Sequence, residues 1–380
     1  MSREPIASIV RFLGMFATLA LLAGCVTFPV SYAGSSDRTP GALFEYPYFG
    51  DQVTGIAVSQ EGRIFVNFPR WGKDPRYSVA EVLADGSLRP YPDVVWNRWG
   101  PAEAGHPEAH FVCVQSVYVK DSFLWILDPA SPAFSGVLPG GAKLVKVNLA
   151  TNLVEQVIPF DAATAPANSY LNDVRLDPQG TAAYITDSGT GAIVAVDLAT
   201  GKSRRLLSDH LSTKAEPGYV PVIGGKELRN DKGEVPTIHA DGIAIDAEGT
   251  YLYYHALTAR TLYRIRTSAL RDPSLSENTV AGQVERLAVT GAVDGMEMDG
   301  RDNLYFTALE ENAIKRYRPD GTITTVVRND HIQWPDSISI SRDDYLYFTA
   351  SQIHLGPRFN HGKDLRVPPF TFFKIWVAPL

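Results

Sequence analysis

The apolar and polar positions of the chain form one pattern that occurs six times. In each copy a polar residue precedes a short apolar strand, a polar turn usually follows, and a second strand rich in Leu, Tyr and Phe comes next. The Asp, Asn, Glu, Gln and Gly residues of these turns tolerate the backbone angles of a tight hairpin. The pattern therefore predicts six β-hairpins, which begin at Thr54, Gln115, Asn172, Asp241, Asp294 and Asp336.

Two further strand-like runs follow most of the hairpins. After the third hairpin, for example, the runs 193–198 and 203–207 flank a turn that contains Gly201. Four short strands repeated six times predict an all-β fold, a six-bladed β-propeller. A β-sandwich does not repeat one hairpin six times, and the repeat of a β-helix would be shorter.

The last copy contains only three strands, because the chain ends soon after the strand-like run that begins at Phe370. The run Ala42–Tyr48 precedes the first copy and also has the pattern of a strand. We expect this run to become the outer strand of the last blade and to close the ring, which removes an exposed sheet edge. The propeller is therefore predicted to span residues 42–380.

The first residues of the chain have the pattern of an export signal. Arg3 and Arg11 precede an apolar run, Phe12–Ala23, which is too short to span a membrane comfortably. The run ends in Leu22-Ala-Gly-Cys25, which resembles the lipobox of bacterial lipoproteins, in which the Cys is diacylated. An ordinary secretory signal with a chance Cys is the alternative.

The lipoprotein interpretation fixes the remaining boundaries and the expected location. Residues 1–24 would be the signal peptide, Cys25 the lipidated residue, and residues 25–41 a flexible tether. We expect an exported protein of the bacterial cell envelope, anchored in the outer membrane on its periplasmic side, or a secreted one. Contact with a membrane is expected only through the lipid on Cys25.

Composition and net charge limit the kinds of partner that the protein is expected to bind. The 380 residues are 45% hydrophobic, which is ample for a large core. The formal net charge of −7 disfavours nucleic acids and suits cationic ligands. The two cysteines cannot make a disulfide framework or a zinc site, and Cys113 is expected to be a buried, small apolar residue.

The first residues of the six hairpins are expected to form one ring, because the innermost strands of a propeller start at one mouth of its channel. The carboxylates of Asp241, Asp294 and Asp336 would repel one another there unless a positive charge lies among them. Oxygen ligands, including the amides of Gln115 and Asn172, favour Ca²⁺ or Mg²⁺. The ring therefore predicts a site for a divalent cation or a protonated amine. Alternatively, an Asp or Asn before Gly simply caps its strand.

The residues that end the second strands are expected to reach the same mouth. His255 is the only imidazole among them and is a candidate acid or base near neutral pH, or else a hydrogen-bonded structural residue. Asp187 follows one such position. Trp334 lies beside the mouth with Trp71, where aromatic rings either wall a pocket or pack the loops. The candidate ligand-binding residues are thus Gln115, Asp187, His255, Trp334 and Asp336.

Seven segments of the chain have the form of motifs known from one protein family: Phe65-Val-Asn-Phe-Pro-Arg-Trp71, Tyr91-Pro with Trp96-Asn97, Leu124-Trp-Ile-Leu-Asp128, Tyr170-Leu-Asn-Asp-Val174, Tyr184-Ile-Thr-Asp-Ser188, Tyr253-Tyr-His-Ala-Leu257 and Trp334-Pro-Asp336. With these motifs the chain resembles the Yellow/major royal jelly protein family, in its bacterial branch. The resemblance extends from about Leu43 to Val377 and implies a six-bladed propeller related to gluconolactonase and regucalcin-like lactonases. The family includes biogenic-amine binders, a nutritive glycoprotein and proteins linked to melanin chemistry, so membership does not settle the activity.

The lactonases carry a divalent metal in the channel mouth, and the resemblance implies which residues would hold it here. Asn172, Asp241 and Asp294 match three of the metal positions, whereas Thr54 replaces a Glu. A metal-dependent lactone hydrolase with Asp294, and His255 beside it, as catalytic residues is therefore the alternative. The missing Glu favours the first hypothesis, an envelope-anchored binding protein for a small cationic ligand or a divalent cation. A platform for protein interactions on the loop face is a third hypothesis.

Overall fold

The computed structural model of the chain describes residues 38–39 and 41–377. The predicted signal peptide, Cys25 and most of the predicted tether lie outside the described residues, so the lipoprotein hypothesis stays a prediction. Within the described ranges, no helix is long and apolar enough to cross a membrane.

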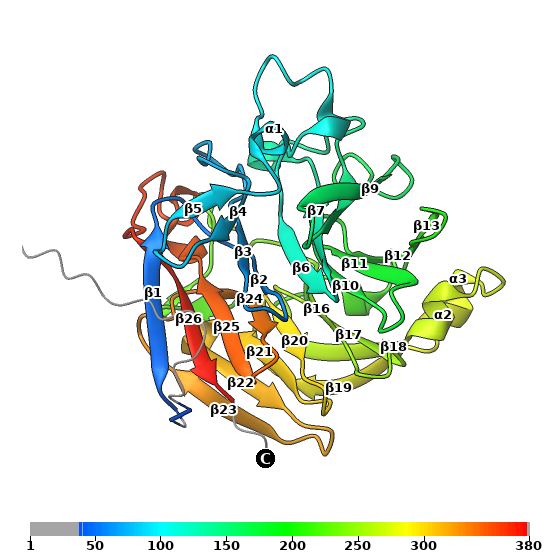
Figure 1. Cartoon of the computed structure of the whole chain (residues 1–380). Coiled ribbons are helices and arrows are strands. Elements are labelled where there is room, and N and C mark those ends of the chain that lie inside the picture. Colours follow the sequence, from blue (N-terminus) through cyan, green and yellow to red (C-terminus); the bar gives the residue numbers. More distant parts are fainter. Residues whose placement is uncertain (1–37, 40, 378–380) are drawn as a thin grey trace, which may run out of the picture.

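Six four-stranded antiparallel sheets are arranged around a central axis, so the protein is the predicted all-β, six-bladed propeller (Figure 1). In each of the first three blades the chain runs outward from the axis. Blade 1 contains β2 (Ile56–Val58), β3 (Ile64–Asn67), β4 (Val79–Val82) and β5 (Leu88–Pro90). Blade 2 contains β6 (Ser116–Lys120), β7 (Phe123–Asp128), β8 (Lys143–Asn148) and β9 (Leu153–Pro159). Blade 3 contains β10 (Leu171–Leu176), β11 (Ala182–Asp187), β12 (Ala192–Asp197) and β13 (Ser203–Leu206).

The last three blades follow the same order, and the sixth completes the ring. Blade 4 contains β16 (Ala240–Ile245), β17 (Tyr251–Ala256), β18 (Thr261–Arg266) and β19 (Glu285–Val289). Blade 5 contains β20 (Met296–Met298), β21 (Leu304–Ala308), β22 (Ala313–Tyr317) and β23 (Ile323–Arg328). Blade 6 contains β24 (Pro335–Ile340), β25 (Tyr345–Ala350), β26 (Phe370–Trp376) and β1 (Leu43–Phe49).

The predicted closure of the ring is confirmed. Strand β1 pairs antiparallel with β26, with Leu43 opposite Ile375 and Phe49 opposite Phe370 (Figure 1). The ring of Tyr46 stacks on that of Phe372, with centroids 4.7 Å apart. The strand next to the start of the described chain thus covers the edge that the last strand would otherwise expose.

The elements outside the sheets are short and lie in the connections. Helix α1 (Val94–Asn97) lies between blades 1 and 2, and α2 (Thr267–Arg271) and α3 (Glu277–Ala281) lie between β18 and β19. The hairpin β14 (Val222–Ile223) and β15 (Lys226–Glu227) belongs to the long connection between blades 3 and 4.

The hydrophobic core is divided among the interfaces between neighbouring sheets. One cluster, for example, joins Leu127 of blade 2 to Val174 and Val194 of blade 3. The innermost strands of successive blades contact one another around the axis, and β24 contacts β2 where the ring closes. This packing fixes the six strand starts relative to one another, which is what positions the candidate site.

Candidate functional site

A cavity of 790 Å³ lies at one mouth of the channel, between the strand starts and the long loops. We call it the upper cavity. Five of the six residues of the predicted ring line it: Gln115, Asn172, Asp241, Asp294 and Asp336. The sixth, Thr54, is buried beside it and accepts a hydrogen bond of 3.0 Å from Asn67 Nδ2. The structure therefore brings five of the predicted ring residues together at this mouth and leaves Thr54 outside the lining.

Backbone irregularities and glycines explain how these side chains come together. The pairing of the first two strands is irregular at the ring residue in blades 3, 4 and 6, and such bulges redirect side chains. A Cβ on Gly242 would lie 2.3 Å from the carbonyl oxygen of Asp294, and one on Gly295 would lie 2.0 Å from that of Asp336. Only glycine permits so close an approach. Blades 4, 5 and 6 therefore pack tightly and gather the three aspartates.

A chain of hydrogen bonds runs around the floor. The hydroxyl of Tyr170 donates to Gln115 Oε1 (2.9 Å), and Gln115 Nε2 donates to Asn172 Oδ1 (3.4 Å). Asn172 Nδ2 then donates to Asp241 Oδ2 (2.8 Å). The two amides thus have their orientation fixed by neighbours on either side.

The three carboxyl groups of the floor receive donors only from neutral groups within the described part of the chain. Trp334 Nε1 donates to Asp294 Oδ2 at 2.7 Å, and Ser351 Oγ donates to Asp336 Oδ2 at 2.8 Å. The carboxyl groups of Asp241 and Asp294 are close enough to influence each other's pKa. No Lys or Arg side chain among the described residues pairs with either of them.

The electrostatics of the floor favour protonated carboxyl groups. Burial raises the pKa of Asp294 to about 7, against the lowering effect of hydrogen bonds from Trp334 and Asp241. Burial and then the charge of Asp294 raise the pKa of Asp241 and that of Asp336 well above the usual range. Like charges in a low-dielectric site resist simultaneous ionisation. A cation on the floor would reverse these changes in pKa.

The rim of the upper cavity is basic as well as acidic. Lys73, Arg358 and Arg366 line it together with Asp51 and Asp364. Arg366 pairs with Asp364 (2.7 Å), and the guanidinium of Arg358 lies 5.5 Å from the ring centroid of Phe134. Lys73 and Arg358 are exposed, and no ion pair among the described residues joins these positive charges to Asp241, Asp294 or Asp336.

Aromatic side chains form one wall of the cavity. The rings of Trp71 and Phe134 stack with centroids 5.4 Å apart, and Phe134 also contacts Tyr170 at 5.1 Å. Trp71 Nε1 donates to the Tyr170 hydroxyl at 2.6 Å. Trp71 and Trp334 line the cavity as the sequence suggested, whereas Phe134, from the loop between β7 and β8, had no local pattern that marks it.

The residues that end the second strands were expected to reach the channel mouth, but Thr186 and Asn67 lie between neighbouring blades. Thr186 Oγ1 donates to the carbonyl of Asp241 (2.6 Å), and Asn67 Nδ2 donates to that of Gln115 (3.0 Å). These side chains join one blade to the next, and neither lines the upper cavity. They hold the backbone of the ring residues in place.

His255 is one of these strand-end residues and lies outside the cavity lining. It is fully buried, its Nδ1 donates to the carbonyl of Ala256 (2.7 Å), and Nε2 accepts from Thr290 Oγ1 (2.9 Å). Burial lowers the pKa of this imidazole to about 4. The structure does not bring His255 together with Asp294, so these two residues do not form a pair for acid–base catalysis.

Asp187 is also buried, and it organises a loop beside the cavity. Its Oδ1 accepts backbone N–H groups of Tyr170 (2.8 Å) and Gly189 (2.9 Å), and Oδ2 pairs with Arg205. Burial raises the pKa of Asp187, but the charge of Arg205 and these hydrogen bonds outweigh it, so the net pKa is lowered. Asp187 thus positions Tyr170 and Gly189, which line the cavity, while its own carboxylate does not.

The residues of the floor have the right atoms for Ca²⁺ or Mg²⁺ but are not arranged as a metal cage. No group of three or more His, Cys, Asp and Glu side chains in the described residues is placed to hold a metal. Asp241 Oδ2 and Asp294 Oδ2 already accept N–H groups, and Thr54 supplies no carboxylate. The set Asn172, Asp241 and Asp294 therefore does not fit a lactonase-type metal in this arrangement.

Cys113 has no chemical role at this site. It is a free thiol, fully buried, and burial raises its pKa to about 12, which keeps it protonated and unreactive. The predicted structural role of Cys113 agrees with this environment.

These observations define the class of protein, which is a six-bladed propeller with a polar, acidic floor at one mouth of its channel. Residues 114–361 match the family model for major royal jelly protein, so the chain belongs to that family. It is 25% identical over 297 residues to Major royal jelly protein 5 of Apis mellifera, a match that covers 74% of this chain and 47% of that protein. Major royal jelly protein 6 of the same organism is 25% identical over 214 residues, a match that covers 53% of this chain and 45% of that protein. The chain thus spans about half the length of the curated relatives it matches.

Solved structures with similar folds are more distant in sequence. A luciferin-regenerating enzyme has a TM-score of 0.56 at 11% identity, covering 89% of this chain and 96% of its own. A gluconolactonase from Xanthomonas campestris has a TM-score of 0.54 at 12% identity, and the match covers 91% of this chain and 94% of that one. A calcium-binding protein, regucalcin, from Agrobacterium tumefaciens has a TM-score of 0.51 at 17% identity, and the match covers 86% of this chain and 90% of that one. These similarities establish the fold alone.

Proposed function

We propose that the upper cavity binds a small ligand that carries a protonated amine beside an aromatic or apolar group. The observation that carries this proposal is the cluster of Asp241, Asp294 and Asp336, three buried carboxyl groups without a Lys or Arg partner among the described residues. A desolvated ammonium would supply the missing charge and the N–H donors that this floor accepts.

The aromatic wall suits the rest of such a ligand. Trp71, Phe134 and Tyr170 present ring faces and edges within the same cavity as the carboxyl groups. A flat apolar group would gain about 25 cal/mol for each Å² of its surface removed from water, and a nearby ammonium adds a cation–π term. The rim charges would then select against ligands too large to pass between them.

Matched ligands test this proposal most directly. We expect 2-phenylethylamine to bind in isothermal titration calorimetry, and 2-phenylethanol, which has the same ring and chain, to bind roughly tenfold more weakly or worse. Asp336→Asn should weaken amine binding, whereas Asp364→Asn at the rim should change it little. Equal affinities for the amine and the alcohol would rule the proposal out.

The alternative is a metal-dependent lactone hydrolase, and it rests on the match of Asn172, Asp241 and Asp294 to lactonase metal positions. Such an enzyme would retain a stoichiometric divalent cation after dialysis and would hydrolyse lactones, with Asp294→Asn inactive. If metal analysis finds none and the variant matches the wild type, this alternative fails. The arrangement of the floor favours the amine.

The location of the protein remains part of the proposal. We propose that the chain is exported and anchored through a lipid on Cys25, so that the propeller meets its ligand in the cell envelope. Labelling with a radioactive fatty acid should mark the wild type and Cys113→Ala but not Cys25→Ala. Label that persists in Cys25→Ala would argue for a different anchor.

A further inference from the structure

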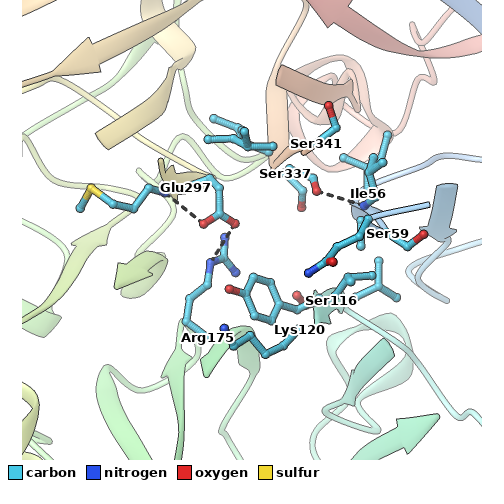
Figure 2. A pocket seen from close by; sticks show the side chains of 18 of the residues that line it. Ile56, Ser59, Ser116, Lys120, Arg175, Glu297, Ser337 and Ser341 are labelled. Carbon is cyan, nitrogen blue, oxygen red and sulfur yellow. Dashed lines mark hydrogen bonds and ion pairs between the residues drawn. The ribbon is translucent and has the colours of Figure 1, made fainter. Parts of the chain in front are cut away.

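A second cavity, of 520 Å³, lies at the opposite end of the channel. Figure 2 shows residues that line it. We call it the lower cavity. It is lined by the inner strands and by the hairpin turns at Ser59, Asp121 and Arg342, and it shares no lining residue with the upper cavity. Its volume falls in the range of about 300–1,000 Å³ typical of small-molecule pockets.

Neighbouring residues of the same strands build the two cavities. Gln115, Asn172 and Asp336 line the upper cavity, and the residues that follow them, Ser116, Asp173 and Ser337, line the lower one. In the other three blades this following position is a glycine that brings two backbones or side chains together: Gly55, Gly242 and Gly295. Half of the blades therefore project a polar side chain into the lower part of the channel.

Arg175 is the central charged group of the lower cavity. It is 3% exposed, it donates to the carbonyls of Val174 and Met296, and its Nε lies 3.4 Å from Glu297 Oε2 (Figure 2). This Nε has no hydrogen-bond partner, and the guanidinium lies 4.9 Å from the ring centroid of Tyr118. A buried N–H that is left unpaired costs free energy, so a group in the cavity that accepts this hydrogen is stabilising.

The carboxyl groups beside Arg175 are also incompletely paired. Asp173 Oδ2 lies 3.8 Å from Arg175 Nη1, too far for a hydrogen bond, and Glu297 Oε1 accepts only the backbone N–H of Met298 among the contacts of the described residues. Buried ion pairs are stable only when their remaining donors and acceptors are satisfied. The triad of Asp173, Arg175 and Glu297 therefore offers both donors and acceptors to a ligand.

The lining of the lower cavity has no net charge. Its basic residues are Lys120, Arg175 and Arg342, and its acidic residues are Asp121, Asp173 and Glu297. Neither a cation nor an anion is attracted by such a balance. The remaining polar side chains are neutral hydrogen-bonding groups, namely Ser59, Gln60, Ser116, Tyr118, Ser337, Ser339 and Ser341.

We propose that the lower cavity is a second binding site, which takes a small uncharged polyhydroxylated molecule of the polyol or monosaccharide class. Hydroxyl groups of such a ligand would donate to the carboxylates of the triad, and one hydroxyl would accept the single hydrogen of Arg175 Nε. Its C–H groups contact the apolar side chains of the lining, such as Ile56 and Met298. The site is separate from the upper cavity, so it does not depend on the function proposed there.

Three six-carbon probes that differ in one end group test this proposal: sorbitol, gluconate and glucamine. Titration calorimetry on the full chain should give saturable binding of sorbitol, with the anionic gluconate and the cationic glucamine roughly tenfold weaker. Calorimetry is preferred to thermal shifts, because polyols stabilise proteins by exclusion from their surfaces. Saturating 2-phenylethylamine should leave sorbitol binding unchanged, which separates this result from the fate of the upper cavity.

Two conservative variants place the binding at the lower cavity. Tyr118→Phe keeps the ring beneath Arg175 and removes one hydroxyl, so sorbitol affinity should fall roughly two- to tenfold; Tyr263→Phe, outside both cavities, is the matched control. Glu297→Gln removes one negative charge, which leaves the lining with a net positive charge, and should shift the preference toward gluconate. The proposal is overturned if either gluconate or glucamine binds as tightly as sorbitol. It is also overturned if a crystal grown with sorbitol holds only ordered water in the lower cavity.

Discussion

The indole N–H of Trp334 donates a hydrogen bond of 2.7 Å to Oδ2 of Asp294, and both side chains are buried on the floor of the upper cavity. Trp334→Phe should therefore lower the free energy of unfolding by about 1–3 kcal/mol at pH 8, the cost of an unpaired buried acceptor. Urea unfolding measures this loss. Trp376→Phe is the control, because Trp376 Nε1 has no hydrogen-bond partner, and a loss as large there would contradict the assignment.

The raised pKa of Asp294 predicts how stability depends on pH. Burial raises this pKa to about 7, so the folded state holds the proton more tightly than the unfolded chain does. The resulting stability is complete below the unfolded pKa and is lost as the pH rises through about 7. A tenfold difference in proton affinity between the folded and unfolded states is worth about 1.4 kcal/mol. Unfolding curves between about pH 5 and pH 8 should show this decline, and Asp294→Asn should reduce it.

Ligand binding should show the opposite dependence on pH. An ammonium on the floor favours ionised carboxylates, so protons held by Asp241, Asp294 and Asp336 must leave when the amine binds. Amine affinity should increase by up to tenfold for each pH unit between about pH 6 and pH 8 for every proton released. Calorimetry in buffers of different ionisation enthalpy counts those protons. An affinity that does not change with pH would contradict the proposed floor.

A buried ion pair in blade 2 should contribute strongly to stability. Lys143 Nζ contacts Asp128 Oδ2 at 2.9 Å and donates to the carbonyls of Pro107 and Gly141, while Asp128 accepts three backbone N–H groups. Lys143→Met should cost about 3–5 kcal/mol, because it leaves Asp128 charged and buried. Arg229→Met breaks the exposed pair with Glu227 and should cost less than about 1 kcal/mol. If both variants lose a similar free energy of unfolding, the buried pair contributes no more to stability than the exposed one, and the prediction is wrong.

Strand β1 should be essential to the ring, although it is far from blade 6 in the sequence. Removal of residues 1–41 should lower the melting temperature only slightly, because β1 and its pairing with β26 remain. Removal of residues 1–49 should lower it and promote aggregation, since the edge of β26 is then exposed. Differential scanning calorimetry and light scattering measure the two effects. Equal behaviour of the two truncations would mean that the closure contributes little.

Much of the fold and of the upper cavity follows from the sequence, because both depend on local patterns. Alternating apolar residues and turn residues determine six hairpins, and the missing fourth strand of blade 6 determines that residues 42–48 close the ring. The ring residues Asn172, Asp241, Asp294 and Asp336 were found because they occupy one position of a repeat. Neither the boundaries of the signal peptide nor lipidation at Cys25 is tested by the described residues.

Only the tertiary structure decided where side chains point once blades pack together. His255 and Thr186 end equivalent strands, yet both are buried in hydrogen bonds of the scaffold, because neighbouring backbones compete for their donors and acceptors. The wall of Trp71, Phe134 and Tyr170 joins loops from three blades, and no local pattern records such a contact. The lower cavity has the same origin: Arg175 meets Glu297 across the channel because the closed ring brings β10 and β20 together, 122 positions apart.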